Sequence, residues 1–144
     1  MKKEKSIASV VSIHILTTSI VIPFFGLLAG YFVNKFLSGS LNEGLLMIIK
    51  DLVYVSFFFM GVKYSISYIN KKIEVKNPES SSKYSIIVFG ILITIMWVIN
   101  ILAGLNIIGI AYNTIFFGVI FAIFFILTKK YFEKLTQEVQ LAEA

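Results

Sequence analysis

Three charged side chains lie inside an otherwise apolar stretch of the chain, residues 44–65. They are Lys50, Asp51 and Lys63, and their neighbours are mostly leucine, isoleucine, valine and phenylalanine. A charged side chain in a membrane-spanning helix is energetically costly, so such a residue marks a candidate functional site. The chemistry that it supports is the binding or passage of a polar solute. The competing interpretation is that these side chains reach the lipid headgroups and only anchor the helix.

Asp51 has two polar counterparts in other apolar stretches. If one membrane surface lies near residues 45, 105 and 107, Asp51 lies about six residues, or roughly 9 Å, below that surface. Asn100 and Asn113 lie at a similar depth, because they flank the turn at 105–107 almost symmetrically. The sequence therefore predicts a polar vestibule formed by Asp51, Asn100 and Asn113. The alternative is an interfacial Asp51 that bonds water or Lys35.

His14 and Lys63 fall in the opposite half of the membrane. Lys63 follows Asp51 by twelve residues, which is about 18 Å along a helix, so the two side chains cannot pair. We predict that His14 packs with a hydrogen bond to Thr17 or Thr18 rather than relaying protons. A Ser-His-Asp hydrolase is disfavoured, because the single histidine and Asp51 lie toward opposite membrane surfaces.

The composition argues against several classes of catalyst. The chain has no cysteine and one histidine, so it has neither a thiolate site nor a histidine pair that could hold a metal. The one acidic residue within the apolar stretches cannot form a carboxylate-only metal site. All 13 basic residues are lysines, and without arginine the chain lacks the bidentate donor that nucleic-acid sites favour. We predict a protein without catalytic residues, metal, other cofactor or nucleic-acid partner.

Four long apolar stretches carry these side chains. They cover residues 7–33, 45–69, 84–105 and 107–128, and each is near or above the roughly 20 residues that cross a bilayer as a helix. The chain is 58% hydrophobic with a mean hydropathy of +0.88, whereas soluble domains are about 45–50% apolar. The sequence therefore predicts an all-α integral membrane protein, a four-helix transmembrane bundle in a single domain, residues 1–130.

The lysines predict the orientation of the bundle. Ten of them flank helix ends that must share one side of the membrane, and only Lys35 and Lys50 lie toward the other side. Cytoplasmic loops collect lysines, so we expect both termini in the cytoplasm of a prokaryote, with the chain in its inner membrane. The ten are Lys2, Lys3, Lys5, Lys71, Lys72, Lys76, Lys83, Lys129, Lys130 and Lys134.

Two further features predict contacts between helices or with partners. Gly26 and Gly30 form a G-x-x-x-G pattern, which lets another helix approach closely, either within the chain or in a second copy. Pro23 removes the N–H that would bond the Ser19 carbonyl, which predicts a kink in the same span.

The second contact feature is the C-terminal segment. Residues 131–144 are expected to form a cytoplasmic amphipathic tail that lies on the membrane or docks to a partner. Its apolar stripe comprises Phe132, Leu135, Val139 and Ala142.

The size, the four-helix layout and the helix end INKKIEV (69–75) resemble GtrA-like proteins. Those proteins are associated with the transfer of polyprenyl-linked sugars across membranes. The likeness covers two short helix ends, and the chain lacks the aromatic residue that the family pattern would have after Lys72. No residue role is taken from it.

We therefore expect a non-enzymatic membrane protein that serves as an accessory or assembly subunit of a membrane complex. Its partners would be the bilayer and either another membrane protein or a second copy of itself. The alternative is a homo-oligomeric channel, or a transporter of small or lipid-linked solutes, with a polar outer vestibule around Asp51.

Overall fold

The chain is almost entirely helical and contains four segments that are long and apolar enough to cross a membrane. The computed structural model describes residues 3–104 and 106–143, and the side chains of residues 4–104 and 106–141. The all-helical class and the four predicted spans are thereby confirmed. The elements in order are β1 (Lys3–Lys5), α1 (Ile7–Leu16), the π-helical turn η1 (Thr17–Val21), α2 (Ile22–Leu37), α3 (Glu43–Lys72), β2 (Ile73–Val75), α4 (Pro78–Leu102) and α5 (Ile107–Glu143).

The observed helix boundaries differ by a few residues from those expected at several helix ends, most clearly at the start of α4. Helix α4 begins at Pro78 rather than at residue 84, because the Asn77 side chain accepts a hydrogen bond from the Ser80 amide at 3.1 Å and caps the helix. Helix α5 runs without interruption from Ile107 to Glu143, so the tail continues the fourth helix, as its sequence pattern predicts. The tail is helical because it continues a helix that is already formed.

The first span is interrupted near its middle, directly before Pro23. In η1 the Ile22 amide bonds the Thr17 carbonyl, five residues back, instead of the usual four. Because Pro23 cannot donate to the Ser19 carbonyl, the wider turn redistributes the backbone hydrogen bonds at this point. The buried face of the span advances by five residues here, from Thr18 to Pro23.

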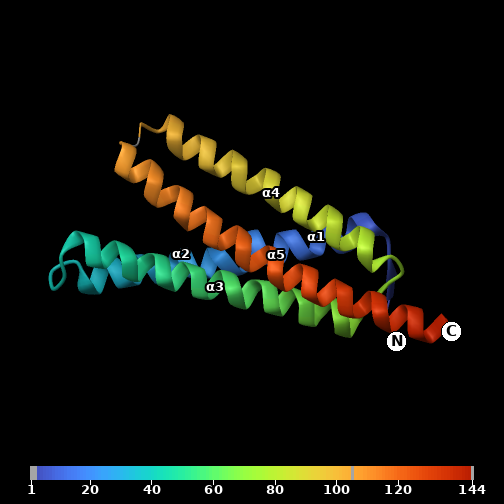
Figure 1. Ribbon diagram of the computed structural model, residues 1–144. Coiled ribbons are helices and arrows are strands. Elements are labelled where there is room, and N and C mark those ends of the chain that lie inside the picture. The colour runs from blue at the N-terminus through green and yellow to red at the C-terminus, as the bar shows by residue number, and fades with distance from the viewer. Residues whose placement is uncertain (1–2, 105, 144) are drawn as a thin grey trace.

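Two helical hairpins diverge from a common base. Figure 1 shows α2 with α3 in one hairpin and α4 with α5 in the other, with their connecting turns far apart. Toward the other end, α1 packs against α4, and α3 packs against α5. Both ends of the described chain lie at this second end, together with most of the lysines. We call it the lysine end and the opposite one the turn end.

Glycines allow the close contact between α2 and α3. A Cβ atom on Gly26 would lie 2.9 Å from Phe57 Cβ, and one on Gly61 would lie 3.0 Å from Ile22 Cβ. The G-x-x-x-G contact at Gly26 is therefore made inside the chain. Gly30 differs, since a Cβ there would meet only Lys50 Cγ, at 4.0 Å.

A short parallel strand pair closes the lysine end. β1 pairs with β2 so that Glu4 lies beside Glu74, and Ile73 is buried beneath the pair. Lys76 Nζ lies 3.0 Å from Glu4 Oε1, and this hydrogen-bonded carboxylate raises the pKa of Lys76 above its ordinary value. The segment 70–83 is thus more than the plain connector expected from its turn residues. The alternation in Ile73, Glu74 and Val75 was the available signal.

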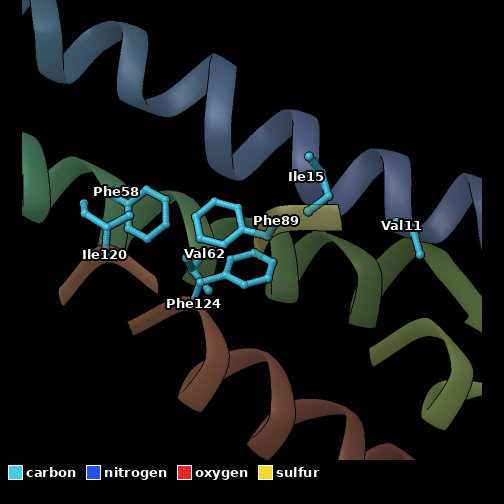
Figure 2. Close-up of a cluster of buried hydrophobic side chains, with 7 residues drawn as sticks. All are labelled: Val11, Ile15, Phe58, Val62, Phe89, Ile120 and Phe124. Carbon is cyan, nitrogen blue, oxygen red and sulfur yellow. The ribbon is translucent and has the colours of Figure 1, made fainter. Parts of the chain in front are cut away.

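The centre of the bundle is filled by packed aromatic rings. Figure 2 shows Phe58, Phe89 and Phe124 gathered from α3, α4 and α5. The Phe89 and Phe124 ring centroids are 4.0 Å apart, and those of Phe58 and Phe89 are 5.6 Å apart. We call these three residues the aromatic plug. Four smaller residues complete the cluster: Val11, Ile15, Val62 and Ile120.

We predict that Gly26→Ala destabilises the protein by about 1–3 kcal/mol, because the added methyl group would overlap Phe57. Reversible unfolding in mixed detergent micelles measures the free energy. Gly118→Ala is the matched control, since a Cβ at Gly118 meets no atom within 4 Å in the described structure. Equal stability of the two variants would show that α2 and α3 do not pack this closely.

Candidate functional site

A cavity of about 600 Å³ lies between the two hairpins at the turn end. We call it the turn-end cavity. Its volume is in the range of small-molecule sites, roughly 300–1,000 Å³. All four spans contribute to its walls. The charged and amide side chains that line it are Asn34 of α2, Lys50 and Asp51 of α3, Asn100 of α4 and Asn113 of α5.

The three residues of the predicted vestibule, Asp51, Asn100 and Asn113, all line this cavity. The divergence of the hairpins explains why they face a common space, since the two hairpins separate toward their connecting turns. Asn34 and Lys50 line the cavity too. Asn34 lies one helical turn beyond Gly30 on the ridge that begins with Gly26, a four-residue spacing visible in the sequence.

Asp51 is half-buried and has a specific partner. Its Oδ2 atom accepts a hydrogen bond from the hydroxyl group of Tyr112, which lies on α5. This contact joins the two hairpins across the cavity wall. Nothing in the spacing of the sequence pointed to Tyr112, because the relative rotation of α3 and α5 cannot be read from either helix alone.

The amide groups of the cavity retain hydrogen-bonding capacity. Asn100 Nδ2 donates to the Met96 carbonyl at 2.8 Å, and Asn113 Nδ2 donates to the Gly109 carbonyl at 2.9 Å. Each bond uses one amide hydrogen and leaves the second hydrogen and the carbonyl oxygen for a ligand. The remaining walls are apolar or aromatic, with Met96, Phe116 and Phe117 among them. Such a lining suits a small solute with polar groups.

Glycine makes room in the cavity wall. Gly30 is buried and faces the cavity, and among the described residues Lys50 is the only neighbour that its Cβ would meet within 4 Å. A larger side chain at this position would extend into the cavity without overlapping the protein.

The aromatic plug lies between the cavity and the lysine end. Along α3 the order is Asp51, Phe58, Ser65, and along α5 it is Asn113, Phe124, Thr128. Because Phe58, Phe89 and Phe124 are each at most 2% exposed, the cavity has no open path through the bundle in this structure.

A buried polar cluster lies beyond the plug and joins three spans. His14 Nδ1 lies 2.7 Å from Ser65 Oγ, and His14 Nε2 lies 2.9 Å from Thr128 Oγ1. The His14 ring also stacks on Phe124, with centroids 5.0 Å apart. The sequence predicts that His14 bonds Thr17 or Thr18 of its own span. In the structure its hydrogen bonds go to other helices instead. The shift in register at η1 could not be foreseen in detail.

Lys63 and the tail residues lie nearer the lysine end. The Lys63 ammonium group lies 4.9 Å from the centroid of the Phe59 ring and is exposed. Phe132 is 1% exposed and packs with Val10, Ile69 and Ile73, so it belongs to the core rather than to a free docking surface. Leu135 packs partly against the same cluster, and Val139 is half-buried. Ala142 lies in α5, but its side chain is outside the described part.

We predict that His14→Leu destabilises the protein by about 1–2 kcal/mol, because the Ser65 and Thr128 hydroxyl groups lose their partner inside the membrane. Adding Ser65→Ala and Thr128→Val should recover part of this loss, since no unpaired polar group then remains there. The free energy of unfolding in micelles is the measurement. A single variant as stable as the parent would contradict a structural role for these bonds.

Among the residues that the structure describes, no three histidine, cysteine, aspartate or glutamate side chains are grouped closely enough to hold a metal ion. No family model, curated protein or solved structure matches the chain. The resemblance to GtrA-like proteins is therefore not supported by a family match. Functional inference depends on the residues that line the cavities.

Proposed function

We propose that the chain is a membrane transport protein that binds a small polar solute in the turn-end cavity. The observation that carries this proposal is the convergence of a carboxylate, an ammonium group and three amides from four spans on one cavity. Polar side chains within a membrane span are costly and are found mostly where they face an interior or an ion or solute path. This was the second of the two functions expected from the sequence.

The function expected first from the sequence, that of an accessory subunit, depended on two contact surfaces that the fold largely uses itself. Gly26 packs against Phe57 of the same chain, and Phe132 is buried in the base of the bundle. Neither residue is free to contact a partner. The polar cavity is not consumed in this way, because its amides keep unused hydrogen-bonding groups.

The closed base of the cavity favours alternating access over an open pore. The solute would enter from the turn end and be released only after the aromatic plug had rearranged. The two hairpins are the natural moving parts, since each is closely packed within itself and they diverge toward the turn end. We place the cavity on the outer side of a prokaryotic inner membrane, because the lysine-rich end belongs in the cytoplasm.

Reconstituted vesicles test the transport function. We expect the protein to pass either potassium ions, followed with a potassium-sensitive dye, or glycerol, followed by light scattering. Asp51→Asn keeps a hydrogen-bond acceptor for Tyr112 but removes the charge, so a cation flux should fall by about tenfold or more. Gly30→Leu should reduce either flux by filling the cavity.

Gly118→Leu is the control, because it adds the same side chain to a membrane helix outside this cavity. Its flux should match that of the parent. Flux of neither solute, or fluxes that Gly30→Leu and Gly118→Leu lower equally, would overturn the proposal.

A docking function for the end of α5 is the second candidate. The last turns of α5 project beyond the rest of the bundle in Figure 1, and Leu141 is 79% exposed. An exposed apolar side chain at the end of a projecting helix is a feature of contact surfaces. This candidate retains the accessory-subunit function in a narrower form.

Truncation after Thr136 tests that candidate, because it removes the projecting turns but keeps Phe132 and Leu135 in the core. We expect the truncated chain to remain folded and to lose any companion protein that co-purifies with the full chain in native mass spectrometry. Truncation after Lys130 would be a poor test, since it removes Phe132. An identical set of companions in both preparations argues against docking through this segment.

A further inference from the structure

A second hollow, of about 420 Å³, lies between α3 and α5 near the lysine end. We call it the lysine-end groove. Lys63, Ser67 and Asn70 line it from one face of α3, and Lys130, Tyr131 and Lys134 line it from α5. The α3 positions recur every three or four residues, and on α5 Lys134 follows Lys130 by four residues and Tyr131 by three, so each set lies along one side of its helix. The groove shares no residue with the turn-end cavity.

The groove is strongly biased toward positive charge. It has three lysines and a single carboxylate, that of Glu138, which lies 3.7 Å from Lys134. In the part of the chain that the structure describes, neither Lys63 nor Lys130 forms an ion pair. Two ammonium groups are therefore available to an anion. Ser67 and Asn70 add hydrogen-bond donors of the kind that phosphate oxygens accept.

The hydroxyl group of Tyr131 is a separate indication of a ligand. It is buried and, within the described structure, has no hydrogen-bond partner. Buried polar groups are nearly always bonded, so an unpaired one beside a cavity calls for an explanation. An acceptor oxygen of a ligand in the groove would satisfy it.

The groove has an apolar side as well as a basic one. Ile66 of α3 and Leu127 and Leu135 of α5 are its apolar lining residues. A ligand that fits both parts has an anionic head and a hydrocarbon body. A free phosphate ion would use the lysines but would gain nothing from these apolar contacts.

We propose that the lysine-end groove binds the headgroup of an anionic phospholipid. Lys63, Lys130 and Lys134 pair with the phosphate group, and the acyl chains leave the groove past Ile66 and Leu127 into the bilayer. Basic pockets between spanning helices on the cytoplasmic side are suited to this ligand class. This inference is independent of the transport function, since it concerns different residues and a resident lipid rather than a transported solute.

Native mass spectrometry of the full chain in detergent tests the proposal, with phosphatidylglycerol as the probe and phosphatidylcholine as the zwitterionic comparison. We expect one phosphatidylglycerol to bind at least about tenfold more tightly than phosphatidylcholine. The triple variant Lys63→Gln, Lys130→Gln, Lys134→Gln should weaken phosphatidylglycerol binding about 100-fold, given about a factor of five for each lysine.

A matched triple variant separates the groove from general surface charge. Lys5→Gln, Lys71→Gln and Lys72→Gln remove the same charge from exposed positions at the same end, and should change the affinity by less than about threefold. Equal losses in the two triple variants would overturn the proposal. So would equal affinities for the two lipids, or displacement of phosphatidylglycerol by millimolar inorganic phosphate, which would identify a soluble anion as the ligand.

Glu138→Gln keeps the test decisive if the groove triple variant does not fold. Removing the one carboxylate of the groove should tighten phosphatidylglycerol binding by about threefold or more, and a misfolded protein would not show such a gain. Tyr131→Phe should weaken binding modestly without lowering stability, because its hydroxyl group bonds no described residue. An unchanged affinity in the Glu138→Gln variant would contradict a phosphate group in this position.

Discussion

The His14 ring is the point at which the separate parts of the bundle are held in register. It bonds Ser65 of α3 and Thr128 of α5, and it stacks on Phe124 of the aromatic plug. Inside a membrane, apolar surfaces alone give little preference for one helix arrangement, because lipid tails are equally apolar. Directional hydrogen bonds and close packing at Gly26 and Gly61 therefore determine where the helices meet. The hairpins separate beyond this junction, and the turn-end cavity is the space that results.

Much of the architecture follows from composition and spacing. Stretches of more than twenty apolar residues must become helices in lipid, and the tight turn after α4 puts Asn100 and Asn113 at one depth. Other features depended on information that no single helix carries. The partners of His14 follow from the rotation of three helices and the extra residue in η1. The early start of α4 at Pro78 depends on a local cap by Asn77, which the hydropathy of residues 84–105 does not reveal.

Small residues allow close contact between helices or leave room in the cavity wall, and large aromatic residues fill the centre of the bundle. Gly26 and Gly61 lie where a methyl group would collide with the facing helix, whereas Gly30 lies where it would meet almost nothing. Glycine thus allows α2 and α3 to pack closely at Gly26, and it leaves space for the cavity at Gly30. The aromatic plug supplies the bulk that the glycines lack, and its three rings separate a polar cavity from a polar cluster. A polar layer therefore lies on each side of an apolar one along the bundle.

The pairing of β1 with β2 has a consequence for the order in which the protein assembles. Glu4 pairs beside Glu74, so the first strand has no partner until about seventy more residues have been made. By then the first two spans have been synthesised, and both lie within the loop that the strand pair closes. During synthesis, β1 therefore remains unpaired until the second span, α3, has been made. The strand pair can therefore form only after Val75 has been made, so chain synthesis sets the earliest moment at which it closes.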